Sequence, residues 1–279
     1  MSILLTGHTG FLGGQVYTRL ISAGLEVITI DRKWDTTKIV DLIESHNERI
    51  DCVIHAATVY DRGEFEIANL LNCNLRLPLY LLELCNKYKI QKFINFSSFT
   101  QYYKNYQFLP LYHKTKNDIS EWMRTYATAH SDTQYYDLVL YHLYGPHDSD
   151  KKFIPWIANA LGSGDREPIA LTGGEQERDF IHVDDVVNLI LILLKKDIQI
   201  KGYSKILVKS GEVSTIRSLV EKLAELSGSK RRCEFGALPY RQGEQFQLID
   251  NQDDVVDIFK YWKATTSLES GLLSIIKSL

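Results

Sequence analysis

The sequence predicts an α/β protein, a doubly wound parallel sheet followed by a smaller C-terminal α/β lobe that binds a substrate. Two observations predict this class. A glycine-rich turn at 7–14 separates an apolar strand pattern from a helical pattern. Short runs rich in β-branched residues then alternate with helical patterns as far as residue 141. Such alternation is typical of βαβ units, because parallel strands need a crossover connection.

Each predicted element has its own local pattern. The strand patterns lie at 3–5, 26–30, 52–55, 92–95 and 137–141. The helical patterns lie at 13–23, 37–47, 67–87 and 111–129, and Pro78 interrupts or starts the third of them.

The alternation loosens after Gly145-Pro146. Helical patterns follow at 153–161, 183–195 and 215–227, with a short strand at 169–172 and more helix within 255–279. We therefore expect a dinucleotide-binding domain over 1–165. Residues 166–279 should form mainly a substrate-binding lobe, with some elements returning to the first domain.

The glycine-rich turn has the spacing of a dinucleotide site, which makes the predicted sheet Rossmann-like. Gly7 would let the chain leave the strand sharply, Gly10 would let the backbone approach a pyrophosphate, and Gly13 would let the helix pack closely. Asp31 ends the second strand about 20 residues downstream, where a carboxylate accepts ribose hydroxyls. Three glycines alone also suit a surface turn, so this strand-turn-helix context carries the prediction.

Composition excludes several other classes. The 279 residues carry a net charge of −3, so no basic surface for nucleic acid is expected. Four scattered cysteines lack metal-ligand spacing and are expected to be buried free thiols, with no metal bound. No apolar run is long enough to cross a membrane, and no signal peptide is expected, so we predict a cytoplasmic protein.

Tyr112 and Lys116 form a candidate proton-transfer pair. Their spacing of four places them on one side of a helix, where the ammonium would lower the tyrosine pKa. Tyr88 and Lys92 share this spacing but fall in different elements, so they need not share a face. Ser98 follows a predicted strand and could hydrogen-bond a carbonyl beside Tyr112, although a turn-forming serine is equally consistent.

Six motifs, in this order, resemble the extended short-chain dehydrogenase/reductases that act on nucleotide sugars: Thr6-Gly7-x-x-Gly10-Phe11-x-Gly13, His55-Ala56-Ala57, Ser97-Ser98, Tyr112-x-x-x-Lys116, Leu143-Tyr144-Gly145-Pro146 and Arg178-Asp179-Phe180-Ile181-His182-Val183-Asp184-Asp185. Three further segments look most like CDP-abequose and CDP-paratose synthases: Lys152-Phe153-Ile154-Pro155, Gly174-Glu175-Gln176 and Glu234-Phe235-Gly236. Those enzymes are 4-reductases that make deoxysugars for surface polysaccharides such as the lipopolysaccharide O-antigen.

The resemblance implies a role for each matched residue. Ser98, Tyr112 and Lys116 would form the catalytic group, and Tyr112 would donate a proton while a nicotinamide supplies hydride. Substrate would contact Ser98, Thr100, Tyr112, Arg178 and Arg241, with the two arginines on the diphosphate. Cofactor would contact Gly7, Thr9, Gly10, Phe11, Leu12, Gly13, Asp31, Arg32, His55, Ala56, Ala57, Asn74, Tyr112 and Lys116. The long helices 67–87 and 111–129 would pair across a homodimer.

The residues after Ser98 narrow the expected reaction. Relatives that dehydrate sugars carry an Asp-Glu pair there, and relatives that both epimerise and reduce carry a cysteine near position 100. This chain has Phe99-Thr100 instead. The chain therefore lacks the acid and base that remove a proton from a carbon atom and expel water. Two reactions of a carbonyl group remain: reduction, or 4-epimerisation through a transient ketone.

The sequence leaves alternatives open for the cofactor and for the class of function. Asp31 favours NAD(H), whereas Arg32 and Lys33 could receive a 2′-phosphate, and the resemblance favours NADP(H). We predict a reductase of an NDP-4-keto-6-deoxyhexose or of its 3,6-dideoxy counterpart. The alternatives are an NDP-sugar 4-epimerase that holds NAD tightly and a dinucleotide-sensing regulator without catalysis.

Overall fold

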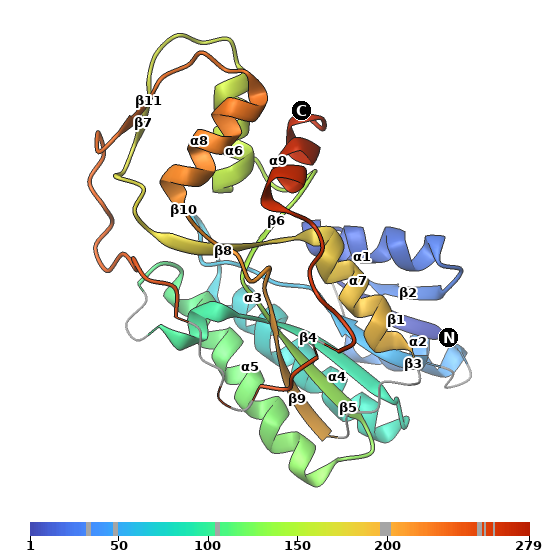
Figure 1. Ribbon diagram of the computed structural model, residues 1–279. Helices are drawn as coiled ribbons and strands as arrows, with labels where there is room; N and C mark the ends of the chain where they lie inside the picture. The colour runs from blue at the N-terminus through green and yellow to red at the C-terminus, as the bar shows by residue number, and fades with distance from the viewer. Residues whose placement is uncertain are drawn as a thin grey trace.

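A six-stranded parallel sheet forms the centre of the computed structural model, which describes residues 1–31, 35–46, 50–103, 107–195, 202–249, 253, 255–258 and 260–279. Its strand order is β2-β1-β3-β4-β5-β9 (Figure 1). The strands are β1 (Ser2–Thr6), β2 (Glu26–Ile30), β3 (Ile50–His55), β4 (Lys92–Ser98), β5 (Gln134–Leu140) and β9 (Gly202–Val208). The order reverses direction between β1 and β3, and ligands of such sheets bind at this switch point. The predicted fold class is confirmed.

Helices cover both faces of this sheet (Figure 1). They are α1 (Phe11–Ser22) and α7 (Val183–Leu194) on one face, and α2 (Thr36–Ser45), α4 (Leu77–Lys87) and α5 (Pro110–Ala129) on the other. Ile3 of β1 belongs to the core under α1 and α7, whereas its neighbour Leu4 belongs to the core under the other helices. Successive strand residues point to opposite faces, so β1 is apolar throughout rather than alternating.

The predicted helix at 67–87 is continuous but not uniform. It consists of α3 (Ile67–Leu71), a π-helical turn η1 (Asn72–Arg76) and α4. Pro78 lies in the first turn of α4, where proline is tolerated, and the irregularity precedes it. The π turn carries Asn74, which is buried at 1% exposure. Single π turns often occur at functional sites.

A second lobe is built around two small sheets, β10-β8-β6 and β11-β7. Its elements are β6 (His142–Tyr144), α6 (Phe153–Gly162), β7 (Ile169–Leu171), β8 (Glu177–His182), β10 (Val213–Thr215), α8 (Ile216–Ser227), β11 (Cys233–Phe235) and α9 (Leu268–Ile276). A separate core packs α6, α8 and α9 together. Thus α6, which falls within 1–165, packs in the lobe, whereas α7 and β9, which fall within 166–279, return to the main sheet (Figure 1).

Two buried aspartates tie later loops to the junction between these parts. Asp179 accepts hydrogen bonds of 2.8 Å from both backbone N–H groups of 210–211. Asp185 accepts bonds of 2.9 and 3.2 Å from the backbone of 265–266. Both carboxylates are about 1% exposed, so these bonds offset the cost of burying charge.

Within the described residues, no helix is long and apolar enough to cross a bilayer. All four cysteines are free thiols; Cys52 and Cys85 are buried as predicted, whereas Cys73 and Cys233 are only partly buried.

Candidate active site

The β1–α1 turn lies directly against the end of β3. Gly7 has φ = 76°, and a Cβ placed there would lie 2.6 Å from the carbonyl carbon of Ala56. A Cβ on Gly13 would lie 2.6 Å from the carbonyl carbon of Gly7. Real Cβ atoms do not approach backbone so closely. The first glycine is therefore needed for the sharp turn and the last for helix packing, in agreement with the roles predicted from spacing.

The N-terminus of α1 can receive an anion. Gly10 is its N-cap, no side chain in the described part of the chain caps it, and its first turn has no acidic residue. The leading N–H groups of an α-helix have no partner within the helix, and the dipole there is positive. Thr9 and Gly10 are exposed, and Phe11 and Leu12 are partly exposed. This end of α1 fits the pyrophosphate of a dinucleotide.

His55 is the last residue of β3 and lies opposite Thr6 of β1 at the switch point. Its Nδ1 lies 2.9 Å from the Thr6 hydroxyl, which also accepts from the Ala57 N–H at 3.2 Å. Burial, with a contribution from the charge of Lys116, lowers the His55 pKa to about 3, so its ring is neutral. Its Nε2 is buried without a hydrogen-bond partner in the described residues. A polar atom of a bound cofactor would satisfy it.

Asp31 is exposed immediately after β2. Arg32 lies outside the described residues, so its predicted contact with a 2′-phosphate stays a prediction.

Tyr112 and Lys116 lie in the first two turns of α5. The Lys116 ammonium lies 5.9 Å from the centre of the Tyr112 ring and donates a 2.8 Å bond to the Phe96 carbonyl of β4. The helix starts after Leu109, whose φ is 54° and whose side chain provides no cap. Asp61 caps it instead, accepting from the N–H groups of Leu111 at 2.9 Å and Tyr112 at 3.2 Å. Sequence reasoning missed Asp61, because this cap comes from 50 residues away.

The prediction that Lys116 lowers the Tyr112 pKa is wrong for this structure. Burial raises the pKa of Tyr112 well above its ordinary value, and a hydrogen bond from Ser98 opposes this only in part. The neighbouring Tyr60, whose ring centre lies 4.6 Å from that of Tyr112, raises it further. Burial also lowers the pKa of Lys116 to about 8. Tyr112 is therefore a protonated phenol here, suited to donate a proton.

Ser98 stands at the start of a three-residue polar chain. It ends β4 and is the N-cap of a 3-10 turn, η2 (Phe99–Tyr102). The Ser98 hydroxyl lies 2.8 Å from the Thr100 hydroxyl, which lies 2.5 Å from Nδ1 of His113. All three side chains are buried. His113 was not singled out from sequence, although it directly follows Tyr112.

Asn74 acts as a brace in this structure. Its amide nitrogen donates to the Val59 carbonyl at 2.8 Å and to the Thr115 hydroxyl at 3.1 Å, and its oxygen accepts from the Val59 N–H at 2.8 Å. Both of its donor hydrogens are thereby used. These bonds fix the segment after β3 against α5, and the predicted contact of Asn74 with the cofactor stays a prediction.

The two arginines predicted to grip a diphosphate have different surroundings. The Arg178 guanidinium is buried, forms a 2.8 Å ion pair with Glu244 and donates to the Gln245 carbonyl at 2.8 Å. A diphosphate at Arg178 would compete with Glu244 for the guanidinium. Arg241 is exposed, and its guanidinium lies 4.6 Å from the ring centre of Phe108, just before α5. Of the two, only Arg241 combines exposure with proximity to the start of α5.

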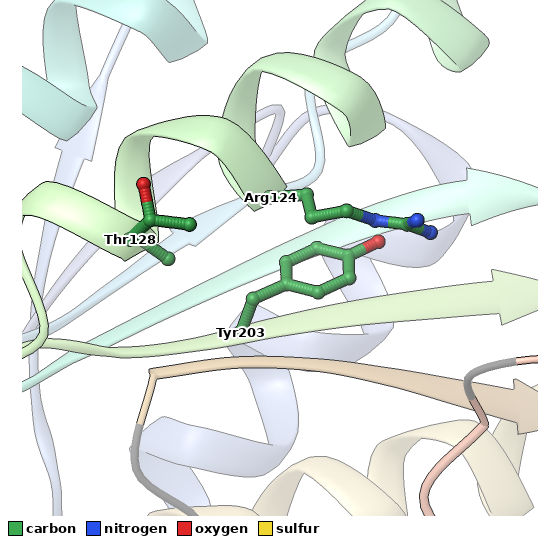
Figure 2. A pocket seen from close by; sticks show the side chains of 4 residues that line it. Arg124, Thr128 and Tyr203 are labelled. Carbon is green, nitrogen blue, oxygen red and sulfur yellow. The ribbon is translucent and has the colours of Figure 1, made fainter.

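A pocket further along α5 is separate from this site. It is lined by Arg124, Ala127, Thr128 and Tyr203, and Figure 2 shows the Arg124 guanidinium beside the Tyr203 hydroxyl. Arg124 lies eight residues beyond Lys116 along the helix, or about 12 Å at 1.5 Å per residue. The Tyr203 hydroxyl donates to the buried Asp137 at 2.9 Å, so this tyrosine is anchored in the sheet.

Comparison with known proteins identifies the family. Residues 3–206 match the family model described as the NAD dependent epimerase/dehydratase family. The chain belongs to this family. It is 29% identical to a CDP-abequose synthase of Salmonella typhimurium, over 99% of this chain and 98% of that protein. It is likewise 29% identical to a CDP-abequose synthase of Salmonella muenchen, over 97% and 95%. The resemblance to extended short-chain dehydrogenase/reductases is confirmed.

Solved structures share the fold. A UDP-glucose 4-epimerase of Thermotoga maritima with UDP-glucose superimposes with a TM-score of 0.81 at 23% identity, covering 100% of this chain and 98% of that one. A UDP-glucose 4-epimerase of Thermus thermophilus in complex with NAD gives a TM-score of 0.76 at 19% identity, with the same coverage.

The tight β1–α1 turn generates a prediction with a matched control. Gly7 and Gly24 both have left-handed φ, 76° and 73°, but a Cβ on Gly24 meets nothing within 4 Å. We expect Gly24→Ala to lose about 1–2 kcal/mol of stability from backbone strain alone and to bind NADH like the wild type. Gly7→Ala should be less stable still and bind NADH at least tenfold more weakly, as measured by thermal unfolding and fluorescence titration. Equal NADH affinities in the two variants would contradict the close approach.

Proposed function

We propose that this protein reduces the 4-keto group of a nucleoside-diphosphate 4-keto-6-deoxyhexose. The observation that carries the proposal is Tyr112 beside both the Lys116 ammonium, 5.9 Å from its ring centre, and Ser98, which hydrogen-bonds to it. Ser98 is followed by Phe99 and Thr100, where a dehydrating enzyme needs a carboxylate pair. Phenol, hydroxyl and ammonium suffice to stabilise and protonate a carbonyl oxygen. They do not provide the separate acid and base needed to remove water from carbon.

The chain's own residues perform the proton chemistry. Tyr112, kept protonated by its raised pKa, donates to the carbonyl oxygen as that oxygen gains charge. The Ser98 hydroxyl orients the same oxygen, and the Lys116 ammonium lies beside the phenol, 5.9 Å from the centre of the Tyr112 ring. The β1–α1 turn, the N-terminus of α1 and the end of β3 would hold the dinucleotide, which when bound in its reduced form supplies the hydride.

The curated relatives support the choice of substrate class. Two relatives named CDP-abequose synthase align over nearly the whole chain, so we propose a CDP-linked 4-keto-6-deoxy or 4-keto-3,6-dideoxy sugar as the first substrate to test. Such a reductase would act in the biosynthesis of deoxysugars for surface polysaccharide, as a cytoplasmic enzyme. We retain a preference for NADPH as part of the proposal, although a named structural relative contains NAD.

A 4-epimerase is the second candidate, because several structural relatives are named 4-epimerases. The same three residues would serve it. An epimerase retains its NAD through turnover, whereas a reductase consumes reduced cofactor and releases it. A regulator that only senses dinucleotides has no use for a phenol and ammonium placed together.

The test is a screen with matched variants. CDP-, dTDP-, GDP- and UDP-4-keto-6-deoxy sugars are supplied with NADPH or NADH, and oxidation of the cofactor is followed by absorbance. Net oxidation is expected with the CDP sugar. Tyr112→Phe should lower turnover on the order of 10²-fold or more while its affinity for the cofactor stays within twofold.

Tyr126→Phe, on the same helix about 21 Å away, is the control and should retain wild-type turnover. Interconversion of 4-epimers without net oxidation would favour the epimerase. Tyr112→Phe turnover above half that of the wild type would reject the catalytic assignment.

The different settings of the two arginines generate a second prediction. Arg241→Ala should raise the KM for the sugar nucleotide roughly ten- to a hundredfold, through loss of charge-assisted hydrogen bonds of about 1.5–3 kcal/mol. Its stability and affinity for NADPH should not change. Arg178→Ala should in addition lower the free energy of unfolding, because Glu244 loses its partner. Kinetics and chemical denaturation of both variants check this, and an unchanged KM in Arg241→Ala would remove it from the substrate site.

We also propose a homodimer in which α3–α4 and α5 of two copies form a four-helix contact. Apolar side chains are exposed on these helices: Ile67 56%, Leu71 42%, Leu111 37% and Trp122 56%. Trp122→Glu should give a monomer by light scattering at micromolar concentration, since a charge would be desolvated in the contact. Trp156→Glu is the control, because Trp156 is 42% exposed on α6 of the other lobe, and should remain a dimer. A monomeric wild type would reject the proposal.

A further inference from the structure

We propose that His113 is a positioning residue which, through Thr100, directs the proton of the Ser98 hydroxyl toward the oxygen of the bound substrate. The inference rests on the proposed carbonyl chemistry at Tyr112 and adds two residues to it. It begins with three buried polar side chains in series, from the 3-10 turn after β4 to the first turns of α5.

The number of hydrogen bonds that Ser98 can form limits the direction in which this series of side chains can donate. Its oxygen has two acceptor sites and one proton. The Thr100 N–H points at this oxygen from 3.4 Å, and the Thr100 hydroxyl lies 2.8 Å from it. If the Thr100 hydroxyl also donates to Ser98, both acceptor sites are filled. The single Ser98 proton is then available for Tyr112 or for a substrate carbonyl.

If the single Thr100 proton is donated to Ser98, the 2.5 Å contact between Thr100 and Nδ1 of His113 is a hydrogen bond only when Nδ1 donates. Burial lowers the His113 pKa to about 4, against the opposing effects of a hydrogen bond to the Phe108 backbone and of the Asp61 charge, so the ring is neutral at neutral pH and carries one N–H. The tautomer with the proton on Nδ1 gives the order His113 to Thr100 to Ser98.

This order suits a reductase. Donation along a series of hydrogen bonds polarises each successive group, so Ser98 becomes a stronger donor. In this order the Ser98 proton is left for Tyr112, and a hydrogen bond between Ser98 and Tyr112 lowers the pKa of Tyr112 in opposition to burial. The opposite tautomer would turn the Ser98 proton away, toward Thr100. His113 releases no proton in this scheme, and Tyr112 alone supplies the one that is transferred.

The test is a double-mutant cycle on turnover of the 4-keto sugar. Thr100→Val and His113→Leu each break the chain, and each should lower kcat roughly three- to tenfold, the effect of one hydrogen bond, with KM and NADPH affinity within twofold. The double variant should be no slower than the slower single variant, because both act through Ser98. His113→Asn, whose amide can occupy the place of Nδ1, and Thr100→Ser should recover most of the loss. His130→Leu, at the end of α5, is the control and should match the wild type.

A measurement independent of turnover separates this inference from the proposed function. In protein labelled with ¹⁵N-histidine, the His113 signal, assigned by its loss in His113→Leu, should report a proton on Nδ1. A proton on Nε2, or multiplicative effects of the two single variants on kcat, would overturn the inference while wild-type reduction stands. Absence of wild-type turnover with every 4-keto sugar would instead reject the proposed function, and the tautomer would still be measured.

Discussion

No side chain fits between the β1–α1 turn and the end of β3, and the rest of the site depends on this contact. Gly7 and Gly13 let three backbone segments meet where the strand order reverses. Thr6 stabilises this contact through three hydrogen bonds. Its carbonyl accepts from the Ala56 N–H at 3.2 Å, and its hydroxyl bonds to the Ala57 N–H and to Nδ1 of His55. Because the contact is between backbones, it fixes the N-terminus of α1 relative to the sheet more firmly than side-chain packing would.

The helix α5, which carries Tyr112 and Lys116, is positioned by groups that come from elsewhere in the chain. Asp61 caps its start, Asn74 bonds to Thr115, and the Phe96 carbonyl receives Lys116. None of these partners lies within one helical turn of the residue that it holds. The placement of the phenol and ammonium is therefore a property of the assembled sheet, and a peptide spanning α5 alone would not reproduce it.

Local patterns predicted the elements well because local forces shape them. The strands β1 to β4 and the helices α1 and α5 agree with their predicted ranges to within a few residues. The strand β9 was missed, since its buried Ser204 and Lys205 interrupt the apolar pattern of an inner strand. Side-chain chemistry was less predictable. The raised Tyr112 pKa depends on burial, and the Arg178 ion pair depends on Glu244, 66 residues away. The spacing of residues in the sequence shows neither the burial of Tyr112 nor the contact between Arg178 and Glu244.

The π turn at Asn72–Arg76 makes the number of residues in this segment matter as much as their identity. Each residue advances a helix by about 100°, so deletion of one residue here would restore an ordinary α-helix and rotate everything before it by that angle relative to α4. The buried apolar residues of α4 would keep their places, while Asn74 would leave Val59 and Thr115. In homologous chains, a gap of one position at this turn should therefore mark a changed arrangement of the segment beside α5 even where the surrounding residues are identical.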